Sequence, residues 1–208
     1  MIDLGGRRLY LCTPDRPDLA DFLTACVRGG VDVVQLREKE LEAKALIARA
    51  RLAGAVCADL GVPFILNDRP DLALEVGADG VHVGQEDAPA NLARRILGPD
   101  AIIGLSTHSP ADLESALSEP VDYLSAGPVV ATPTKPGRPG TGPEYVQAAT
   151  ARAPWPVFVT GDVTPTRTPS LAAHGCRHFV AVRWLTEAAD PRSAARQLRD
   201  AIDEALTP

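Results

Sequence analysis

A run of alternating polar and charged side chains follows an apolar segment near residue 35. The apolar residues Val33 to Leu36 break abruptly into Arg37-Glu38-Lys39. Gln35, Arg37 and Lys39 alternate, so in an extended chain their side chains point the same way. One amide and two cations on one face form an anion-binding edge. The alternative is a strand end followed by a solvated turn of mixed charge.

Two aspartates follow the next two apolar runs along the chain. Asp68 comes directly after Phe64-Ile65-Leu66-Asn67, and Asp87 lies a few residues after Gly80-Val81-His82-Val83. If these runs are neighbouring parallel strands, the two carboxylates converge. Mg²⁺ binds one or two carboxylates together with substrate phosphates and water, so the pair predicts a magnesium site. The alternative is that each carboxylate caps the helix that follows it.

A long basic loop follows the apolar run Tyr123-Leu124-Ser125-Ala126. It spans about residues 127–143 and contains Thr132-Pro133-Thr134-Lys135. Threonine hydroxyls, backbone amides and a lysine bind phosphate, and a loop of this length without a pattern of its own tends to be functional. The alternative is a flexible connector.

The elements that must position these groups alternate regularly. Short apolar runs bounded by glycine or proline predict strands, and the segments between them carry apolar residues at helical spacing. Strands are expected at 9–12, 33–36, 63–67, 80–83, 102–106, 123–126, 157–160 and 179–182, with a helix after each. Eight such units predict an α/β fold, a (β/α)8 TIM barrel. No linker divides the chain, so residues 1–208 are expected to form one domain.

An open flavodoxin-like or Rossmann sheet is the alternative fold. No G-x-G-x-x-G follows the first predicted strand, which argues against a dinucleotide-binding sheet.

A barrel builds its active site from the loops after the C-terminal ends of its strands. Ser106 ends the fifth predicted strand, and Gly161-Asp162 and Val182-Arg183 end the seventh and eighth, where barrels commonly bind a phosphate. His82 is expected to be a packed residue inside a strand. No Ser-His-Asp or Cys-His arrangement supplies a nucleophile. The rim therefore predicts a Mg²⁺-assisted reaction of phosphorylated small molecules.

Composition excludes several classes of protein. The 208 residues carry a net charge of −6 and only 4% aromatic residues, which argues against a nucleic-acid partner. The four cysteines, Cys12, Cys26, Cys57 and Cys176, form no C-x-x-C pair and are expected to be buried thiols in a reducing cytoplasm. No apolar run approaches the ~20 residues that span a bilayer. We therefore expect a cytoplasmic protein with no membrane partner, and the sequence leaves a homo-oligomer open.

Five short motifs in order resemble the thiamine phosphate synthase family over essentially the whole chain. They are Gln35-Leu36-Arg37-Glu38-Lys39, Asn67-Asp68, Gly80 to Asp87, Gly104-Leu105-Ser106-Thr107-His108 and Thr132-Pro133-Thr134-Lys135. The resemblance implies a (β/α)8 barrel with Mg²⁺ as its cofactor. It also implies two small-molecule substrates, a pyrimidine diphosphate and thiazole phosphate, which are joined with release of diphosphate.

The resemblance assigns roles to residues. The residues expected to bind substrate are Gln35, Arg37, Glu38, Lys39, Asn67, Ser106, Thr132, Thr134, Lys135, Gly161, Asp162, Val182 and Arg183. Those expected to hold Mg²⁺ are Asp68 and Asp87. The expected catalytic groups are Arg37, Lys39 and Lys135, because cations neutralise the charge of a departing diphosphate.

The chain departs from the family pattern at two positions. Asp162 stands where the family usually has a second glycine, and its carboxylate would repel a phosphate unless it turns away or pairs with a cation such as Arg183. Trp184 replaces a small alanine and is expected to narrow the thiazole-phosphate end. Two alternatives therefore stay open: a thiazole tautomerase-like isomerase and a non-catalytic barrel that binds phosphate ligands.

Overall fold

The computed structural model describes residues 2–132 and 139–207, and these form eight strands and nine helices. The strands are β1 (Leu9–Thr13), β2 (Val33–Leu36), β3 (Phe64–Asn67), β4 (Gly80–Val83), β5 (Ile102–Thr107), β6 (Tyr123–Ala126), β7 (Val157–Val159) and β8 (His178–Ala181). The helices are α1 (Leu19–Arg28), α2 (Ala43–Leu60), α3 (Pro70–Val76), α4 (Ala90–Leu97), α5 (Pro110–Ala116), α6 (Gly142–Arg152), α7 (Thr168–Ala173), α8 (Arg183–Thr186) and α9 (Pro191–Leu206).

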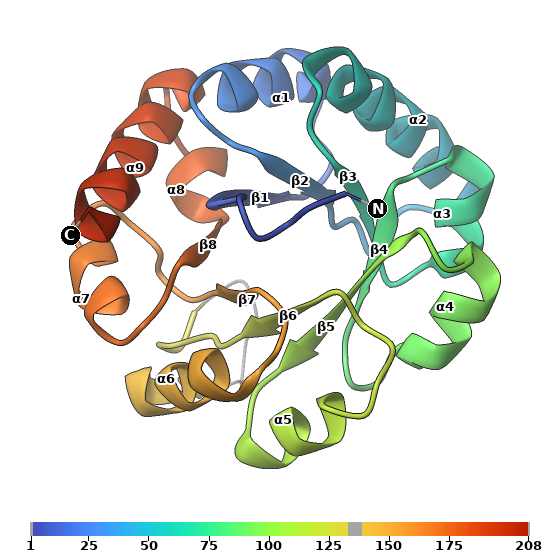
Figure 1. Ribbon diagram of the computed structural model, residues 1–208. Helices are drawn as coiled ribbons and strands as arrows, with labels where there is room; N and C mark the ends of the chain where they lie inside the picture. The colour runs from blue at the N-terminus through green and yellow to red at the C-terminus, as the bar shows by residue number, and fades with distance from the viewer. Residues whose placement is uncertain (1, 133–138, 208) are drawn as a thin grey trace.

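The strands close into a parallel barrel in chain order. Each strand pairs with the next, and β8 pairs with β1 at Tyr10↔Val180. Figure 1 shows the helices as a ring around the barrel and the N-terminal segment lying across one end of it. The predicted TIM barrel is therefore confirmed, and the open-sheet alternative is wrong because the outer strands pair with each other.

Two apolar layers hold the barrel together. Leu9 and Leu11 of β1 point outward into the layer under the helices, whereas Tyr10 and Cys12 point inward. This alternation follows from the two-residue period of a strand. The inward layer consists of Tyr10, Cys12, Val33, Ile65, Ile102, Tyr123, Phe158 and Val180, with Leu4 of the N-terminal segment packed against them.

The sequence did not predict α8. This helix begins at Arg183, two residues after β8 ends, and spans only four residues. A helix of one turn has no apolar periodicity to detect, and its existence depends on the chain leaving β8 through Val182 at φ −123° and ψ −90°. The consequence is that Arg183 starts a helix and does not extend a strand.

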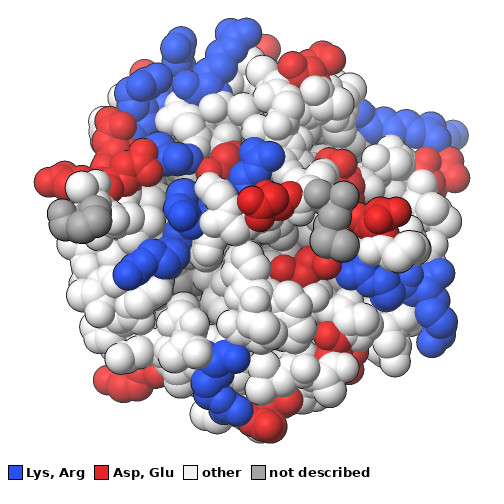
Figure 2. Space-filling model, in the orientation of Figure 1, with Lys and Arg blue, Asp and Glu red and all other residues white. Residues whose placement is uncertain are grey.

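All four cysteines are buried thiols, as predicted. Within the described residues, none of the helices is both long and apolar enough to cross a membrane. On the face of the molecule in Figure 2, basic and acidic side chains are interspersed.

Candidate active site

A large cavity of about 840 Å³ opens at the C-terminal ends of the strands. It brings together most of the residues that the sequence analysis selected. These are Gln35, Arg37, Lys39, Asn67, Asp68, Asp87, Ser106, Thr132, Gly161, Asp162, Val182 and Arg183. Thr134 and Lys135 lie outside the described residues.

Glu38 is not among the residues that line this cavity. Its carboxylate accepts hydrogen bonds from the backbone amides of Asp15 (3.3 Å) and Glu40 (2.7 Å). Both carboxylate oxygens of Glu38 thus accept hydrogen bonds from neighbouring backbone, so Glu38 stabilises the loops of the rim. Arg37 and Lys39, on either side of it in the sequence, line the cavity.

The two predicted metal ligands meet at the rim. Lys39 Nζ lies 2.7 Å from Asp68 Oδ2, and the carboxyl groups of Asp68 and Asp87 lie close enough to shift each other's pKa. Asp87 also accepts a hydrogen bond from the amide of Gly84 at 2.8 Å. Neither side chain caps a helix, since α3 is preceded by Arg69 and α4 by Pro89. The capping alternative is therefore wrong.

Burial and mutual repulsion shape the protonation of this pair. Burial raises the pKa of Asp68, the Lys39 ammonium opposes that rise, and the Asp87 carboxylate adds to it. Burial also acts to raise the pKa of Asp87, but hydrogen bonds from Asp68 and the Gly84 amide outweigh it and lower that pKa overall. The pKa values of the two carboxyl groups are thus shifted in opposite directions, as expected for two like charges that interact.

The pair suits a magnesium ion better than a transition metal. Within residues 2–132 and 139–207, there is no cluster of three or more His, Cys, Asp or Glu side chains that could hold a metal. Mg²⁺ does not need such a cluster, because it takes one or two carboxylates and completes its shell with water and substrate phosphate oxygens. Asp68 and Asp87 provide two oxygen donors whose repulsion a divalent cation would relieve.

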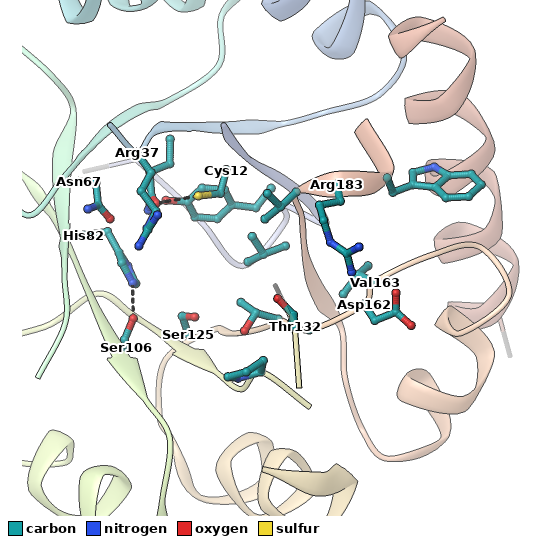
Figure 3. A pocket seen from close by; sticks show the side chains of 18 of the residues that line it. Cys12, Arg37, Asn67, His82, Ser106, Ser125, Thr132, Asp162, Val163 and Arg183 are labelled. Carbon is teal, nitrogen blue, oxygen red and sulfur yellow. Dashed lines mark hydrogen bonds between the residues drawn. The ribbon is translucent and has the colours of Figure 1, made fainter. Parts of the chain in front are cut away.

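Two guanidinium groups reach into the cavity from opposite sides. Figure 3 shows Arg37 on the side of Asn67 and His82, and Arg183 on the side of Asp162 and Val163. Neither forms an ion pair with any residue that the structure describes. A buried or half-buried cation without an anion is costly, so both positions favour an anionic ligand.

Asp162 pairs with a different cation from the one expected. Arg167 Nε lies 2.8 Å from Asp162 Oδ2, and Arg183 takes no part in the pair. Both Gly161 (φ 103°) and Asp162 (φ 57°) have left-handed backbones. At Gly161 a Cβ atom would collide with the backbone of Pro128 and Val129, so only glycine fits there. At Asp162 the left-handed turn directs the carboxylate toward Arg167.

The indole of Trp184 is turned toward the last helix. Its Nε1 donates a hydrogen bond to the carbonyl of Ala194 in α9 at 2.9 Å, and the ring packs against the outer apolar layer. Trp184 also lines the cavity beside Arg183, so it forms an outer wall at this end.

The floor of the cavity is a continuous polar network, of which the sequence had indicated only Gln35 and Ser106 as site residues. Cys12 Sγ lies 3.1 Å from Gln35 Oε1, Gln35 Nε2 lies 2.9 Å from Tyr10 Oη, and Tyr10 Oη lies 2.9 Å from Tyr123 Oη. His82 continues the network, with Nδ1 at 2.9 Å from Tyr123 Oη and Nε2 at 2.9 Å from Ser106 Oγ. The His82–Ser106 contact is drawn in Figure 3.

Comparison with known proteins identifies the family. A family model described as "Thiamine monophosphate synthase" matches residues 9–185. The chain belongs to the thiamine monophosphate synthase family. This confirms the resemblance that the five motifs predicted.

Relatives in this family match nearly the whole chain. A thiamine-phosphate synthase of Mycobacterium tuberculosis (strain ATCC 25177 / H37Ra) is 45% identical and aligns over 97% of both chains. That of Thermobifida fusca is 46% identical over 94% of this chain and 92% of its own. The solved structure of thiamine phosphate pyrophosphorylase from Pyrococcus furiosus is 27% identical, with a TM-score of 0.88 over 96% of this chain and 97% of that one.

One site residue of this family member was misread from the sequence. His82 is buried, as expected, but it also lines the cavity and uses both ring nitrogens in the floor network. Its neighbours Tyr10 and Tyr123 were taken for ordinary strand residues. The sequence does contain an indication of this placement. Once a barrel is assumed, the two-residue period of the strands places Tyr10, Cys12 and His82 on the inward face.

Proposed function

We propose that this chain is a Mg²⁺-dependent thiamine phosphate synthase. It would condense 4-amino-2-methyl-5-(diphosphooxymethyl)pyrimidine with thiazole phosphate to give thiamine phosphate and diphosphate. The observation that carries the proposal is the cavity with Arg37 at one end, Arg183 at the other and the Asp68–Asp87 pair on the same rim. One cavity with two cationic ends suits a reaction between two phosphorylated molecules.

At the diphosphate end, the residues have complementary tasks. Arg37 and Lys39 hold the diphosphate of the pyrimidine substrate, and Gln35 and Asn67 on the buried floor orient its ring. The chemistry that Mg²⁺ supplies when bound is neutralisation of the leaving diphosphate, and Asp68 and Asp87 are the residues that would hold it. Lys135, outside the described residues, is proposed to bind the same diphosphate.

At the opposite end, the thiazole phosphate is held by its phosphate. We assign this task to Thr132, Gly161 and Arg183, with Thr134 outside the described residues. The loops after strands seven and eight and a short extra helix commonly form a phosphate site in barrels of this kind. Thiazole held there presents its ring nitrogen to the pyrimidine methylene carbon. The C–O bond to diphosphate breaks first, diphosphate leaves, and the nitrogen lone pair then forms the new C–N bond with the pyrimidine-methyl cation.

The described residues supply no protein nucleophile in this scheme, and none is needed. The substitution requires two substrates in register and neutralisation of the charge that develops on diphosphate, which is electrostatic catalysis in a preorganised site. We also propose that residues 1–208 act as one barrel domain, since each of the eight strands, or the loop directly after it, contributes residues to the cavity.

The test is to incubate the purified chain with both substrates, with Mg²⁺ or with a chelator, and to separate the products by chromatography. Thiamine phosphate formed only with Mg²⁺ is the expected result. Conversion of the thiazole compound in the absence of the pyrimidine substrate would point instead to an isomerase. Saturable binding of both compounds without any product would identify a non-catalytic binding protein.

A further inference from the structure

The floor network has a definite direction, which follows from the chemistry of its two ends. At one end, Gln35 Oε1 is a carbonyl oxygen and can only accept, so the thiol of Cys12 donates to it. This leaves Gln35 Nε2 facing Tyr10 Oη as a donor. The hydroxyl of Tyr10 therefore accepts from Gln35, and its own hydrogen is left to donate onward.

The same order of donor and acceptor continues through Tyr123 and His82. Tyr10 donates to Tyr123, whose hydroxyl donates in turn to His82 Nδ1. An imidazole that accepts at Nδ1 and is neutral carries its hydrogen on Nε2. His82 consequently donates from Nε2 to Ser106 Oγ.

The hydroxyl hydrogen of Ser106 is left for the cavity. Ser106 is buried and lines the cavity, and its oxygen is already engaged as the acceptor of His82. Ser106 therefore acts as a hydrogen-bond donor toward whatever occupies the floor of the cavity.

The reverse direction requires the amide of Gln35 to turn over. In the reverse direction Tyr123 donates to Tyr10. If the amide keeps its orientation, Tyr10 then accepts from both Gln35 and Tyr123, and its own hydroxyl hydrogen meets no acceptor among the described residues. A buried donor without an acceptor is strongly disfavoured. Turning the amide gives Tyr10 an acceptor but places Nε2 against the sulfur of Cys12, which is a weak acceptor. The thiol of Cys12 therefore favours the direction in which Gln35 donates to Tyr10 and His82 donates to Ser106.

We propose that Cys12 is a positioning residue for this enzyme: its thiol hydrogen fixes the orientation of Gln35, which sets the Nε2–H tautomer of His82 and leaves Ser106 as a donor to the pyrimidine diphosphate substrate. The assignment of Ser106 to that substrate rests on the proposed function. The direction of the network does not, because it follows from the five contacts alone.

The first test reads the tautomer of His82 without any turnover, by ¹⁵N NMR of the imidazole nitrogens in wild-type protein, Cys12→Ala and Cys12→Ser. The wild type is expected to show a protonated Nε2 and an unprotonated Nδ1. Cys12→Ala permits the amide to turn, so a second signal set with protonated Nδ1 should appear. A serine hydroxyl can donate to Gln35 Oε1 but, unlike a thiol, also accepts well from Nε2, so Cys12→Ser should show the second signal set too. Cys26→Ala, a buried cysteine of α1 in the outer layer, is the matched control and should leave His82 unchanged.

The second test is kinetic and separates positioning from a general loss of structure. In Cys12→Ala, kcat should fall about twofold to tenfold, the population change that one hydrogen bond produces, with KM for thiazole phosphate unchanged. In Cys12→Ser kcat should fall by no more than in Cys12→Ala, because the hydroxyl forms a hydrogen bond with either orientation of the amide.

Two results would overturn the inference: an unchanged His82 spectrum in Cys12→Ala, or the same second signal set in the Cys26→Ala control. Failure of the proposed function would look different. In that case wild-type protein would make no thiamine phosphate, while the tautomer pattern and its dependence on Cys12 would still be observed.

Discussion

At the scale of single residues, the rim holds an acidic pair whose repulsion is only partly relieved by Lys39. Asp68 keeps a raised pKa, with burial as its largest cause, and it adopts a left-handed backbone (φ 61°) that holds its carboxyl toward Asp87. Asparagine and aspartate tolerate this conformation better than other side chains. The residue is therefore constrained both by its backbone and by its charge.

Replacing Asp68 separates these two constraints. Asp68→Asn keeps a side chain that tolerates the left-handed backbone and removes the negative charge, so we expect turnover at saturating Mg²⁺ to fall about 100-fold or more with little change in thermal stability. Asp68→Ala should lose the same activity and in addition cost about 1–2 kcal/mol of stability through the backbone. Asp71→Asn, which alters an exposed partner of Arg69, is the control. Normal activity in Asp68→Asn would remove Asp68 from the site.

The end of the cavity at Asp162 and Arg183, where we propose that thiazole phosphate binds, is called the phosphate end. It gives a second prediction, because Asp162 is already paired with Arg167. The side chains of Arg167 and Asp162 are 47% and 37% exposed, so their interaction is screened and worth less than about 1 kcal/mol. Arg167→Ala leaves the carboxylate uncompensated near the phosphate and should raise KM for thiazole phosphate about twofold to fivefold. Asp162→Gly should change KM little, and the double variant should resemble Asp162→Gly. A large fall in KM for Asp162→Gly alone would mean that Arg167 does not neutralise the carboxylate.

The sequence predicted the cavity residues that interrupt an apolar pattern and missed those that continue it. Arg37 and Lys39 were found because a strand has a fixed period and their charges stand out at its end. Tyr10 and Tyr123 were missed because an aromatic residue in an apolar strand resembles core, and only closure of the barrel shows that it faces the cavity floor. The partner of Asp162 was not predictable, since it depends on the φ of one loop residue.

At the scale of elements, β5 and β6 show how a missing side chain makes room for a functional one. Gly104 lies opposite Tyr123 in the register of the two strands. A Cβ atom on Gly104 would collide with the phenol ring and hydroxyl of Tyr123. The ring is stacked on His82, with centroids 5.4 Å apart. The glycine therefore lets Tyr123 reach the floor network.

Gly104→Ala tests this arrangement. The added methyl group has to push the tyrosine ring within a packed interior, so we expect a loss of about 1–3 kcal/mol in the free energy of unfolding measured with urea. The displaced Tyr123 should also weaken its bond to His82 and lower kcat. Gly6→Ala, where the nearest heavy atom to a new Cβ is Asp3 Oδ2 at 3.9 Å, should be neutral. A stable and fully active Gly104→Ala variant would show that the position of Tyr123 does not depend on a glycine at residue 104.

The strands themselves were predicted to within one or two residues because each is a short apolar run bounded by turns. The single missed element, α8, is the one whose formation depends on neighbours far away in the sequence. Its last carbonyls are held from outside: Arg16, in the loop between β1 and α1, donates a hydrogen bond to the carbonyl of Thr186 at 3.2 Å. A one-turn helix is stable only with such support.

At the scale of the whole molecule, closure of the barrel places the loop between β1 and α1 against the short helix α8. Arg16 is fixed on its own side by Asp18 (Nε to Oδ1, 2.6 Å) and by the ring of Phe22, whose centroid lies 3.9 Å from the guanidinium carbon. Arg49 of α2 braces the same loop through Asp15 at 2.5 Å. Through the contacts of Arg16 with α8 and of Arg49 with Asp15, the loop between β1 and α1 thus connects α8, at the phosphate end, to α2.

Arg16→Gln should therefore damage one end of the cavity and spare the other. The variant loses the hydrogen bond that supports α8, so Arg183 at the start of that helix is held less firmly. We expect KM for thiazole phosphate to rise about twofold to tenfold, the effect of one hydrogen bond. KM for the pyrimidine diphosphate should stay unchanged, because the Lys39–Asp68 pair lies in the loops that follow β2 and β3. Arg51→Gln, which breaks an exposed pair with Glu75 on the outer helices, is the control. An equal rise in both KM values would mean that Arg16 supports the barrel as a whole and not its phosphate end.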